Sequence, residues 1–205
     1  VFLSSVRAFL LQQNSFAEEW FDESQLEIGP TEVVYKQWKA SAIIFCTGVS
    51  PFNLWRLLPV KPLKGETLTI KLEERPKLIY NRGVYVVPAT ENKYKVGATY
   101  ETRNLSEAIT EAARLELTTR TRELLKLPFE TVDQNWGMRP TSPDRRPMLG
   151  QHPNSKNVLI FNGLGTKGVS LAPYFAAQLA DWLSGAAEIL PAVNINRFKA
   201  LYSKS

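Results

Sequence analysis

The side chains best suited to chemistry lie between residues 136 and 184. Arg139 precedes Pro140, and a residue before proline is pushed towards an extended backbone. An extended backbone directs the guanidinium away from its own chain, where it can hold a carboxylate through paired hydrogen bonds. We therefore expect Arg139 to bind a carboxylate. The alternative is a structural ion pair between Arg139 and Asp144 or another local acid.

A glycine-rich loop follows a short apolar run in the same segment. Residues 157–162 have the composition of a buried strand, and Gly163, Gly165 and Gly168 come directly after them. A helix is expected from about residue 168 to residue 184, so its free N–H groups and positive dipole end face the loop. Strand, loop and helix N-terminus together predict a cradle for a phosphate or another electron-rich group.

The spacing of these glycines matches the Gly-x-Gly-x-x-Gly fingerprint of dinucleotide-binding folds, but the context disagrees. The fingerprint opens a βαβ unit and is followed, about 20 residues later, by an acidic residue at the end of a second strand. Here Glu188 lies in a loop-like Gly-Ala-Ala-Glu stretch with no strand before it. We do not expect this loop to be the first phosphate-binding loop of a nucleotide domain.

Composition and charge narrow the class of protein. The 205 residues are 44% hydrophobic and 22% charged, which is ordinary for a soluble globular protein. No apolar run approaches the 18 or so residues of a membrane span. A single cysteine excludes an internal disulfide and suits the cytoplasm. The net charge of +5 comes from Lys and Arg mixed with Glu and Asp, and without a basic block a nucleic-acid partner is not expected.

The order of elements predicts an α/β layer interrupted by an antiparallel sheet. A helix is expected over residues 4–13, a short strand over 33–35, and a strand buried on both faces within 40–48. Short β-rich segments follow at 68–72, 83–87 and 94–100. A charged helix then runs from Ser106 or Thr110 to Lys126. These patterns predict domain boundaries at 1–58, 59–140 and 141–205, with the first and last segments forming one layer.

Seven short motifs in this order resemble the carboxy-terminal half of the FAD-dependent D-amino-acid oxidase superfamily, particularly its glycine-oxidase-like members. They lie at residues 43–48, 62–66, 84–88, 96–99, 137–140, 144–150 and 162–173. The resemblance implies an antiparallel substrate-binding domain inserted in an FAD-binding α/β domain. It also implies non-covalent FAD and oxidation of a small amino acid or secondary amine, either as an oxidase or as a dehydrogenase.

The resemblance implies roles for individual residues. Substrate contacts are expected from Arg139, Tyr85, Tyr100, Thr166 and Lys167. Cofactor contacts are expected from Gly48, Gly163, Leu164, Gly165, Thr166, Lys167 and Gly168. Transfer of a hydride equivalent to a flavin needs positioning more than an acid–base pair, so no catalytic acid, base or metal ligand is assigned.

Several of these assignments keep an alternative. Tyr85 could equally be a core or sheet-surface aromatic, and Gly48 an interior strand glycine. Either Thr166 or Lys167 could supply the second substrate contact. His152 is expected to be structural, in a His-Pro turn, and Cys46 to be a small buried hydrophobe.

One departure from the family pattern concerns the nucleotide loop. The family begins with a strand and a Gly-x-Gly-x-x-Gly that binds the ADP part of FAD, and nothing similar lies near Val1. We therefore expect this chain to be a fragment that pairs with a missing N-terminal half, and by itself to be inactive and unable to retain FAD. Two other functions stay open: oxidation of a modified tRNA base, and a non-catalytic ligand-binding domain.

Overall fold

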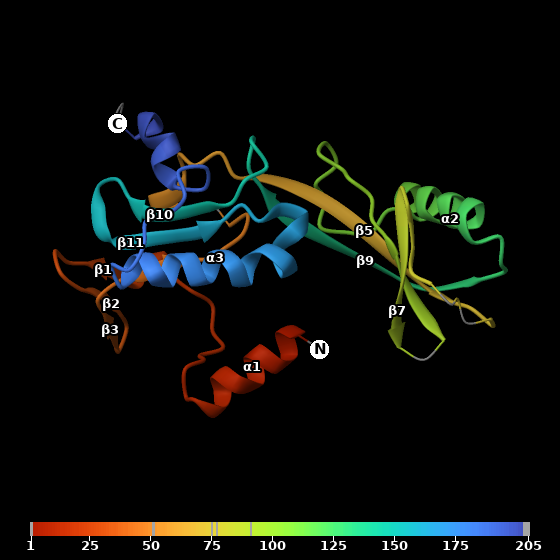
Figure 1. Cartoon of the computed structure of the whole chain (residues 1–205), viewed down its shortest axis with the longest axis horizontal. Helices are drawn as coiled ribbons and strands as arrows, with labels where there is room; N and C mark the ends of the chain where they lie inside the picture. The colour runs from red at the N-terminus through yellow and green to blue at the C-terminus, as the bar shows by residue number, and fades with distance from the viewer. Residues whose placement is uncertain (1, 51, 75, 77, 91, 203–205) are drawn as a thin grey trace.

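Two long antiparallel strands, β5 (Lys61–Lys71) and β9 (Glu130–Thr141), connect two lobes of the molecule. The computed structural model describes residues 2–50, 52–74, 76, 78–90 and 92–202. Figure 1 shows one lobe around β7 and α2 and the other around β10, β11 and α3. Helices and sheets are mixed, and the five-stranded sheet is wholly antiparallel, which confirms the predicted α/β class with an antiparallel sheet.

The antiparallel sheet has the strand order β6-β7-β8-β5-β9. Its shorter strands are β6 (Tyr80–Arg82), β7 (Val84–Thr90) and β8 (Lys93–Gly97). Successive side chains of a strand point to opposite faces, and one face carries the apolar set Leu68, Ile70, Val84, Val86 and Val96, each at most 1% exposed. The three predicted β-rich segments are strands, whereas the length of β9 was not predicted.

Helix α2 (Glu111–Leu125) covers that apolar face. Thr110 is its N-cap, with a side-chain oxygen that accepts a hydrogen bond from the Ala113 N–H at 3.2 Å. Lys126 ends the helix in the left-handed region, at φ 53°. Leu117 and Leu125 pack into the sheet core, so the predicted helix and its Thr110 start are confirmed.

The second sheet, in the order β10-β11-β4, joins sequence-distant segments. β10 (Met148–His152) is antiparallel to β11 (Ser155–Asn162), and β11 is parallel to β4 (Ile43–Phe45). Helix α3 (Gly168–Leu183) packs on this sheet through Phe175 and Leu179. The strand at 157–162 and the helix from 168 are confirmed.

The prediction for residues 40–48 was wrong in two respects. The strand is limited to β4, and it is not buried on both faces, because the Ile44 side chain is 40% exposed. Cys46, predicted to be buried, is exposed. Among the described residues β4 is an edge strand, paired only with β11. One face of β4 is buried, with Phe45 2% exposed, and the face that carries Ile44 is only partly covered.

The remaining elements surround the second sheet. Strands β1 (Leu26–Ile28), β2 (Val33–Tyr35) and β3 (Trp38–Ala40) form a small antiparallel sheet. Short 3-10 helices lie at η1 (Glu23–Gln25), η2 (Asn53–Trp55), η3 (Gly165–Lys167) and η4 (Ile195–Leu201). Helix α1 (Phe2–Gln12), predicted over 4–13, has no buried residue and lies apart from both lobes in Figure 1.

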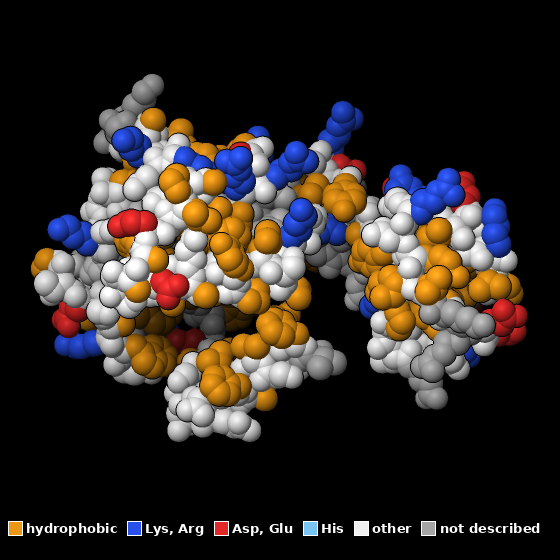
Figure 2. All heavy atoms as spheres, viewed as in Figure 1, with side chains coloured by type: hydrophobic (Ala, Val, Ile, Leu, Met, Phe, Trp, Pro, Cys, Tyr) orange, Lys and Arg blue, Asp and Glu red, His pale blue; other side chains and the backbone are white. Residues whose placement is uncertain are grey.

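The surface does not concentrate charge in one basic block. In Figure 2 many of the visible Lys and Arg side chains lie along the upper edge of the molecule, over both lobes, and others lie at its left and lower edges. Acidic and apolar side chains separate them. Within the described part of the chain, no helix is long and apolar enough to cross a membrane.

Candidate functional site

The carboxyl ends of β4 and β11 lie at the same edge of the second sheet, because the two strands are parallel. The Asn162 side chain joins the loops that follow them. Its Nδ2 donates to the Gly48 carbonyl oxygen at 2.8 Å, and its Oδ1 accepts from the Gly163 N–H at 2.7 Å. Ligands of α/β sheets bind outside such carboxyl ends. Asn162 was not predicted as a site residue, although it directly precedes the glycine loop.

The glycine loop runs from the end of β11 into α3. Gly163 and Gly165 have φ values of +71° and +55°, which L side chains rarely adopt. The 3-10 turn η3 leads into α3 at Gly168, and no side chain caps the α3 N-terminus. Uncapped N–H groups and the positive end of the helix dipole favour an electron-rich ligand there.

A hollow of about 750 Å³ lies against this loop. It brings together the predicted residues Tyr100, Gly163, Leu164, Gly165, Thr166 and Lys167. Its other lining residues are Leu63, Thr141, Ser142, Asp144, Arg145, Arg146 and Leu171. Among the described residues, Gly48, Gly168, Arg139 and Tyr85 do not line it. The hollow is basic, because its three cationic side chains, Arg145, Arg146 and Lys167, have no acidic partner among the described ion pairs, whereas its one acid, Asp144, pairs with Arg197.

Arg139 projects from β9 across the neighbouring strand β5. Its Nη1 donates to the Thr99 carbonyl oxygen at 3.3 Å, and its guanidinium carbon lies 5.3 Å from the centre of the Tyr100 ring. This places Arg139 next to a residue that lines the hollow. Within the described part of the chain, Arg139 forms no ion pair with a carboxylate.

The alternative ion pair between Arg139 and Asp144 was wrong. Asp144 instead accepts from Arg197 Nε at 2.9 Å. Partial burial would raise the pKa of Asp144, but hydrogen bonds from Arg197 and from the Arg146 N–H outweigh burial and lower it. The Asp144 charge is therefore already neutralised by a residue 53 positions away.

Tyr85 lies on the sheet face opposite the α2 core. Its neighbours Val84 and Val86 are each 1% exposed and point into that core, so alternation along β7 places Tyr85 on the other face. A Cβ built at Gly97 would lie 2.7 Å from the Tyr85 hydroxyl. Burial raises the pKa of the Tyr85 phenol, against the opposing effect of the positive charge of Arg139. Tyr85 is thus a neutral donor close to Arg139.

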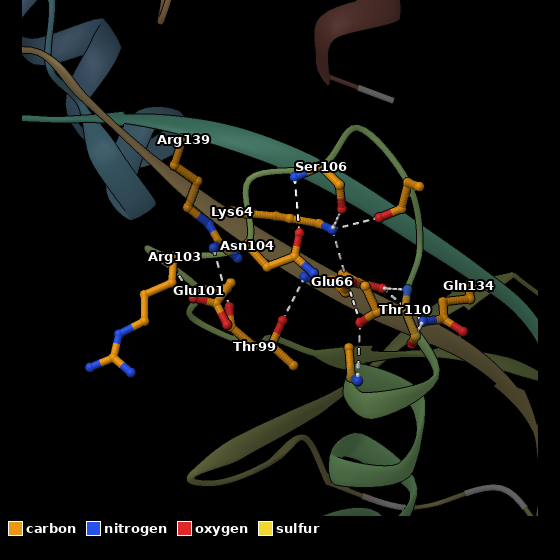
Figure 3. Close-up of polar contacts among 12 residues, drawn as sticks. Lys64, Glu66, Thr99, Glu101, Arg103, Asn104, Ser106, Thr110, Gln134 and Arg139 are labelled. Atoms are coloured by element: carbon orange, nitrogen blue, oxygen red, sulfur yellow. Dashed lines mark hydrogen bonds and ion pairs between the residues drawn. The ribbon is translucent and has the colours of Figure 1, made fainter.

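A buried polar network lies on the α2 side of β5 (Figure 3). Lys64 and Glu66 are 1% and 2% exposed, and their charged groups are 3.3 Å apart. Thr110 donates to Glu66 through both its N–H and its hydroxyl at 2.8 Å, and Gln134 Nε2 donates to Glu66 at 2.8 Å. Lys64 also donates to Ser106 and to the Ala108 carbonyl oxygen.

This network ties the connection between β8 and α2, residues 98–110, to β5. Burial would raise the pKa of Glu66, but the hydrogen bonds from Thr110, Gln134 and Lys64 outweigh it and lower the pKa. A buried charge requires such partners. The sequence analysis did not identify the network; its only signal was a Lys-Gly-Glu triplet at 64–66, just before the β-rich segment predicted at 68–72.

His152 has the structural role that was predicted. Its Nε2 lies 3.1 Å from the Leu54 carbonyl oxygen, and its Nδ1 accepts from the Asn154 N–H at 3.1 Å. The ring also makes edge contacts with Trp55 and Tyr202. Both nitrogens are therefore used within the fold. Across the described residues, no group of three or more His, Cys, Asp or Glu could hold a metal ion.

Comparisons with known proteins agree with this geometry. The model of the FAD dependent oxidoreductase family, DAO, matches residues 18–182. A glycine oxidase of Pseudomonas putida is 32% identical over 159 residues, which cover 74% of this chain and 44% of that protein. A tRNA 5-methylaminomethyl-2-thiouridine biosynthesis bifunctional protein of Hahella chejuensis is 29% identical over 143 residues, or 62% of this chain and 23% of that protein.

A solved structure shows the same fold. Glycine oxidase from Bacillus cereus superposes with a TM-score of 0.68 at 21% identity, covering 80% of this chain and 49% of that chain. This chain therefore spans about half the length, or less, of the relatives it matches.

Proposed function

This chain belongs to the FAD dependent oxidoreductase family, DAO, and we propose that the intact protein uses FAD to oxidise a C–N bond of an amino acid or secondary amine. The observation that supports this most is Arg139, a guanidinium beside the hollow with no carboxylate partner among the described residues. A carboxylate on the substrate would complete its hydrogen bonds. The similarity to a glycine oxidase points to the same class of substrate.

The residues present fit one part of FAD. Gly163 and Gly165 adopt the positive φ values that carry the backbone from β11 to the N-terminus of α3. The uncapped N-terminus of α3 favours negative charge. When bound, the flavin would accept the hydride equivalent that leaves the carbon next to nitrogen. The sequence holds a single Gly-x-Gly-x-x-Gly, the one at 163–168, so we assign the ADP part to the proposed N-terminal half.

The side chains would act by binding and orientation. Arg139 would hold the substrate carboxylate with its free N–H donors, while its contacts to Thr99 and Tyr100 fix the direction of the guanidinium. Tyr85, kept protonated by its raised pKa, would donate a hydrogen bond from the same sheet face. Thr166 and Lys167 line the hollow and are candidates for a second substrate contact. Such fixed positioning is the main contribution a protein makes to this chemistry.

A larger substrate is the second candidate. The similarity to a tRNA-modifying bifunctional protein and the net charge of +5 favour a modified tRNA base. This alternative predicts that activity falls steeply as salt concentration rises, since phosphate contacts dominate nucleic-acid affinity. A small amino acid predicts weak salt dependence.

The substitution Arg139→Ala tests the proposal in the intact protein. For a carboxylate substrate, we expect KM to rise about 10²-fold, in line with the loss of a charged hydrogen bond of about 1.5–3 kcal/mol. Arg139→Lys should restore only part of the affinity, because a point charge cannot reproduce a planar fork. Steady-state kinetics with matched amino-acid and decarboxylated amine substrates provide the measurement.

The decarboxylated amine is the internal control. Its KM should change little in Arg139→Ala, since it offers no carboxylate to the guanidinium. Equal KM values for wild type and Arg139→Ala with every carboxylate substrate would overturn the assignment of Arg139.

A further inference from the structure

Gly65 of β5 lies directly beneath the guanidinium of Arg139. A Cβ built at Gly65 would overlap the Nη1, Nη2 and Cζ atoms of Arg139, far inside van der Waals contact. In the strand ladder Leu63, not Gly65, is the partner of Arg139. The Arg139 side chain therefore runs diagonally across the sheet and lies on Gly65. Only glycine, which has no side chain, leaves room for it.

The backbone on both sides of Gly65 is fixed by the connection 98–110. Lys64 and Glu101 exchange two backbone hydrogen bonds of 2.9 Å, and the Thr99 N–H donates to the Glu66 carbonyl oxygen at 3.1 Å. Tyr100 therefore stands beside Gly65. Arg139 crosses Gly65 to reach the Thr99 carbonyl oxygen and the Tyr100 ring.

Contacts on the opposite face of β5 hold the strand in place beneath Arg139. The side chains that flank Gly65 in sequence are Lys64 and Glu66, which point to the α2 side and form the buried network of Figure 3. Shifting β5 would disturb the hydrogen bonds that Thr110 and Gln134 donate to Glu66. A buried charge that loses such partners is costly. A side chain at position 65 would therefore displace Arg139 rather than β5.

We propose that Gly65 is a positioning residue for Arg139: its missing side chain provides the surface on which the guanidinium lies. The hydrogen bonds of Lys64 and Glu66 to the connection 98–110 and to Gln134 hold that surface in place. The consequence for substrate rests on the proposed function, whereas the contact between Gly65 and Arg139 does not. A methyl group at position 65 would force the guanidinium away from Thr99 and Tyr100, and so away from the hollow.

Gly137 offers a matched control. It lies directly opposite Gly65 in the β5–β9 ladder, and a Cβ built there meets no atom within 4 Å. Gly65→Ala and Gly137→Ala thus each add one methyl group, at two positions that face each other in the β5–β9 ladder. Only the methyl group at position 65 would meet Arg139. Neither glycine has a positive φ, so backbone strain does not separate them.

The test is a double-mutant cycle in the intact protein, with unfolding measured by chemical denaturation and KM measured for a carboxylate substrate. We expect Gly65→Ala to raise KM at least 10-fold, whereas Gly137→Ala leaves it within about 2-fold. Both glycine substitutions are then combined with Arg139→Ala. In that background, Gly65→Ala should change KM and the unfolding midpoint no more than Gly137→Ala does. A crystal structure of Gly65→Ala should show Arg139 without its contact to the Thr99 carbonyl oxygen.

The outcomes separate this inference from the proposed function. If Gly65→Ala has the same effect on unfolding with and without Arg139, the positioning role is wrong. Gly65→Ala and Arg139→Ala could be coupled in unfolding free energy while neither changes KM. In that case Gly65 does position Arg139, and the carboxylate-binding function is wrong. If Gly65→Ala fails to fold, recovery of folded protein on adding Arg139→Ala supports the inference, and no recovery overturns it.

Discussion

Arg139 and His152 differ in how many of their side-chain nitrogens are hydrogen-bonded within the fold. Arg139 contacts a carbonyl oxygen and an aromatic ring, and a guanidinium has five N–H donors, so donors are left for a ligand. His152 has both ring nitrogens occupied by the backbone. The unused donors of Arg139 suit ligand binding, whereas the fully bonded ring of His152 suits a role in the stability of the fold.

The His152 environment predicts a pH dependence of stability. Burial lowers the pKa of His152 from its ordinary value of 6.5, and the opposing hydrogen bond to the Leu54 carbonyl oxygen is the smaller effect. Below pH 6.5 the unfolded chain therefore takes up a proton that the folded chain resists. Stability should be complete above about pH 6.5 and fall as pH decreases towards the folded-state pKa, by at most about 1.4 kcal/mol per pH unit for one proton.

The variant His152→Gln isolates this effect. Glutamine keeps a donor for the Leu54 carbonyl oxygen but does not titrate, so the variant should be less stable at pH 8 and show a shallower slope between pH 7 and pH 5. Denaturant unfolding at several pH values provides the measurement. Glu66 and Asp144 have lowered pKa values, so their contributions are lost only below about pH 4.5. Identical slopes for wild type and variant would contradict this account of His152.

At the scale of elements, one residue with two roles joins the connection 98–110 to helix α2 and to β5. Thr110 caps the helix by accepting from the Ala113 N–H, and its own hydroxyl and N–H donate to Glu66. The helix start, the connection and β5 are thereby joined at one point. Tyr100, which lines the hollow, lies in the same connection.

Thr110→Ala should therefore cost more than the loss of an ordinary helix cap. Removing a cap costs about 1 kcal/mol, and losing a hydrogen bond to a buried carboxylate adds about 1.5 kcal/mol or more. We expect the free energy of unfolding to fall by about 2–3 kcal/mol, measured by chemical denaturation. Thr110→Ser retains the hydroxyl and should stay within about 0.5 kcal/mol of wild type. A loss no larger for Ala than for Ser would show that the hydroxyl is not the anchor.

At the scale of the whole molecule, the candidate site forms where the two lobes meet. β5 and β9 carry Arg139 and Gly65 from the antiparallel sheet towards the second sheet (Figure 1). Residues 163–167, which follow β11 of the second sheet, line the hollow. The chain covers 44% of a related glycine oxidase. We therefore propose that the rest of the site comes from an N-terminal half of the same protein.

This proposal predicts a difference in cofactor retention. The 205-residue chain should purify colourless, because its single glycine loop contacts only one part of FAD. The intact protein should be yellow, with a flavin absorbance band that is released by denaturation, as expected for a non-covalent cofactor. Absorbance spectra and titration with FAD provide the comparison. Stoichiometric, tight FAD on this chain would contradict the assignment of the ADP part to another segment.

Local patterns determined much of this protein from sequence. The β-rich composition of 68–72 and 83–87 predicted strands, and helix starts were predicted at Thr110 and near Gly168, because composition and capping act over a few residues. The extended Arg139 before Pro140 follows from the same kind of local constraint. These features need no knowledge of distant contacts.

The partners of these residues were decided only by the tertiary structure. Asp144 pairs with Arg197, Glu66 accepts from Thr110 and Gln134, and Ile44 is left at a sheet edge. Each outcome depends on which segments, 40 to 70 residues apart in several cases, meet in space. The contact between Gly65 and Arg139 is also a tertiary one. The need for glycine at position 65 follows only from the side chain of another strand that crosses it.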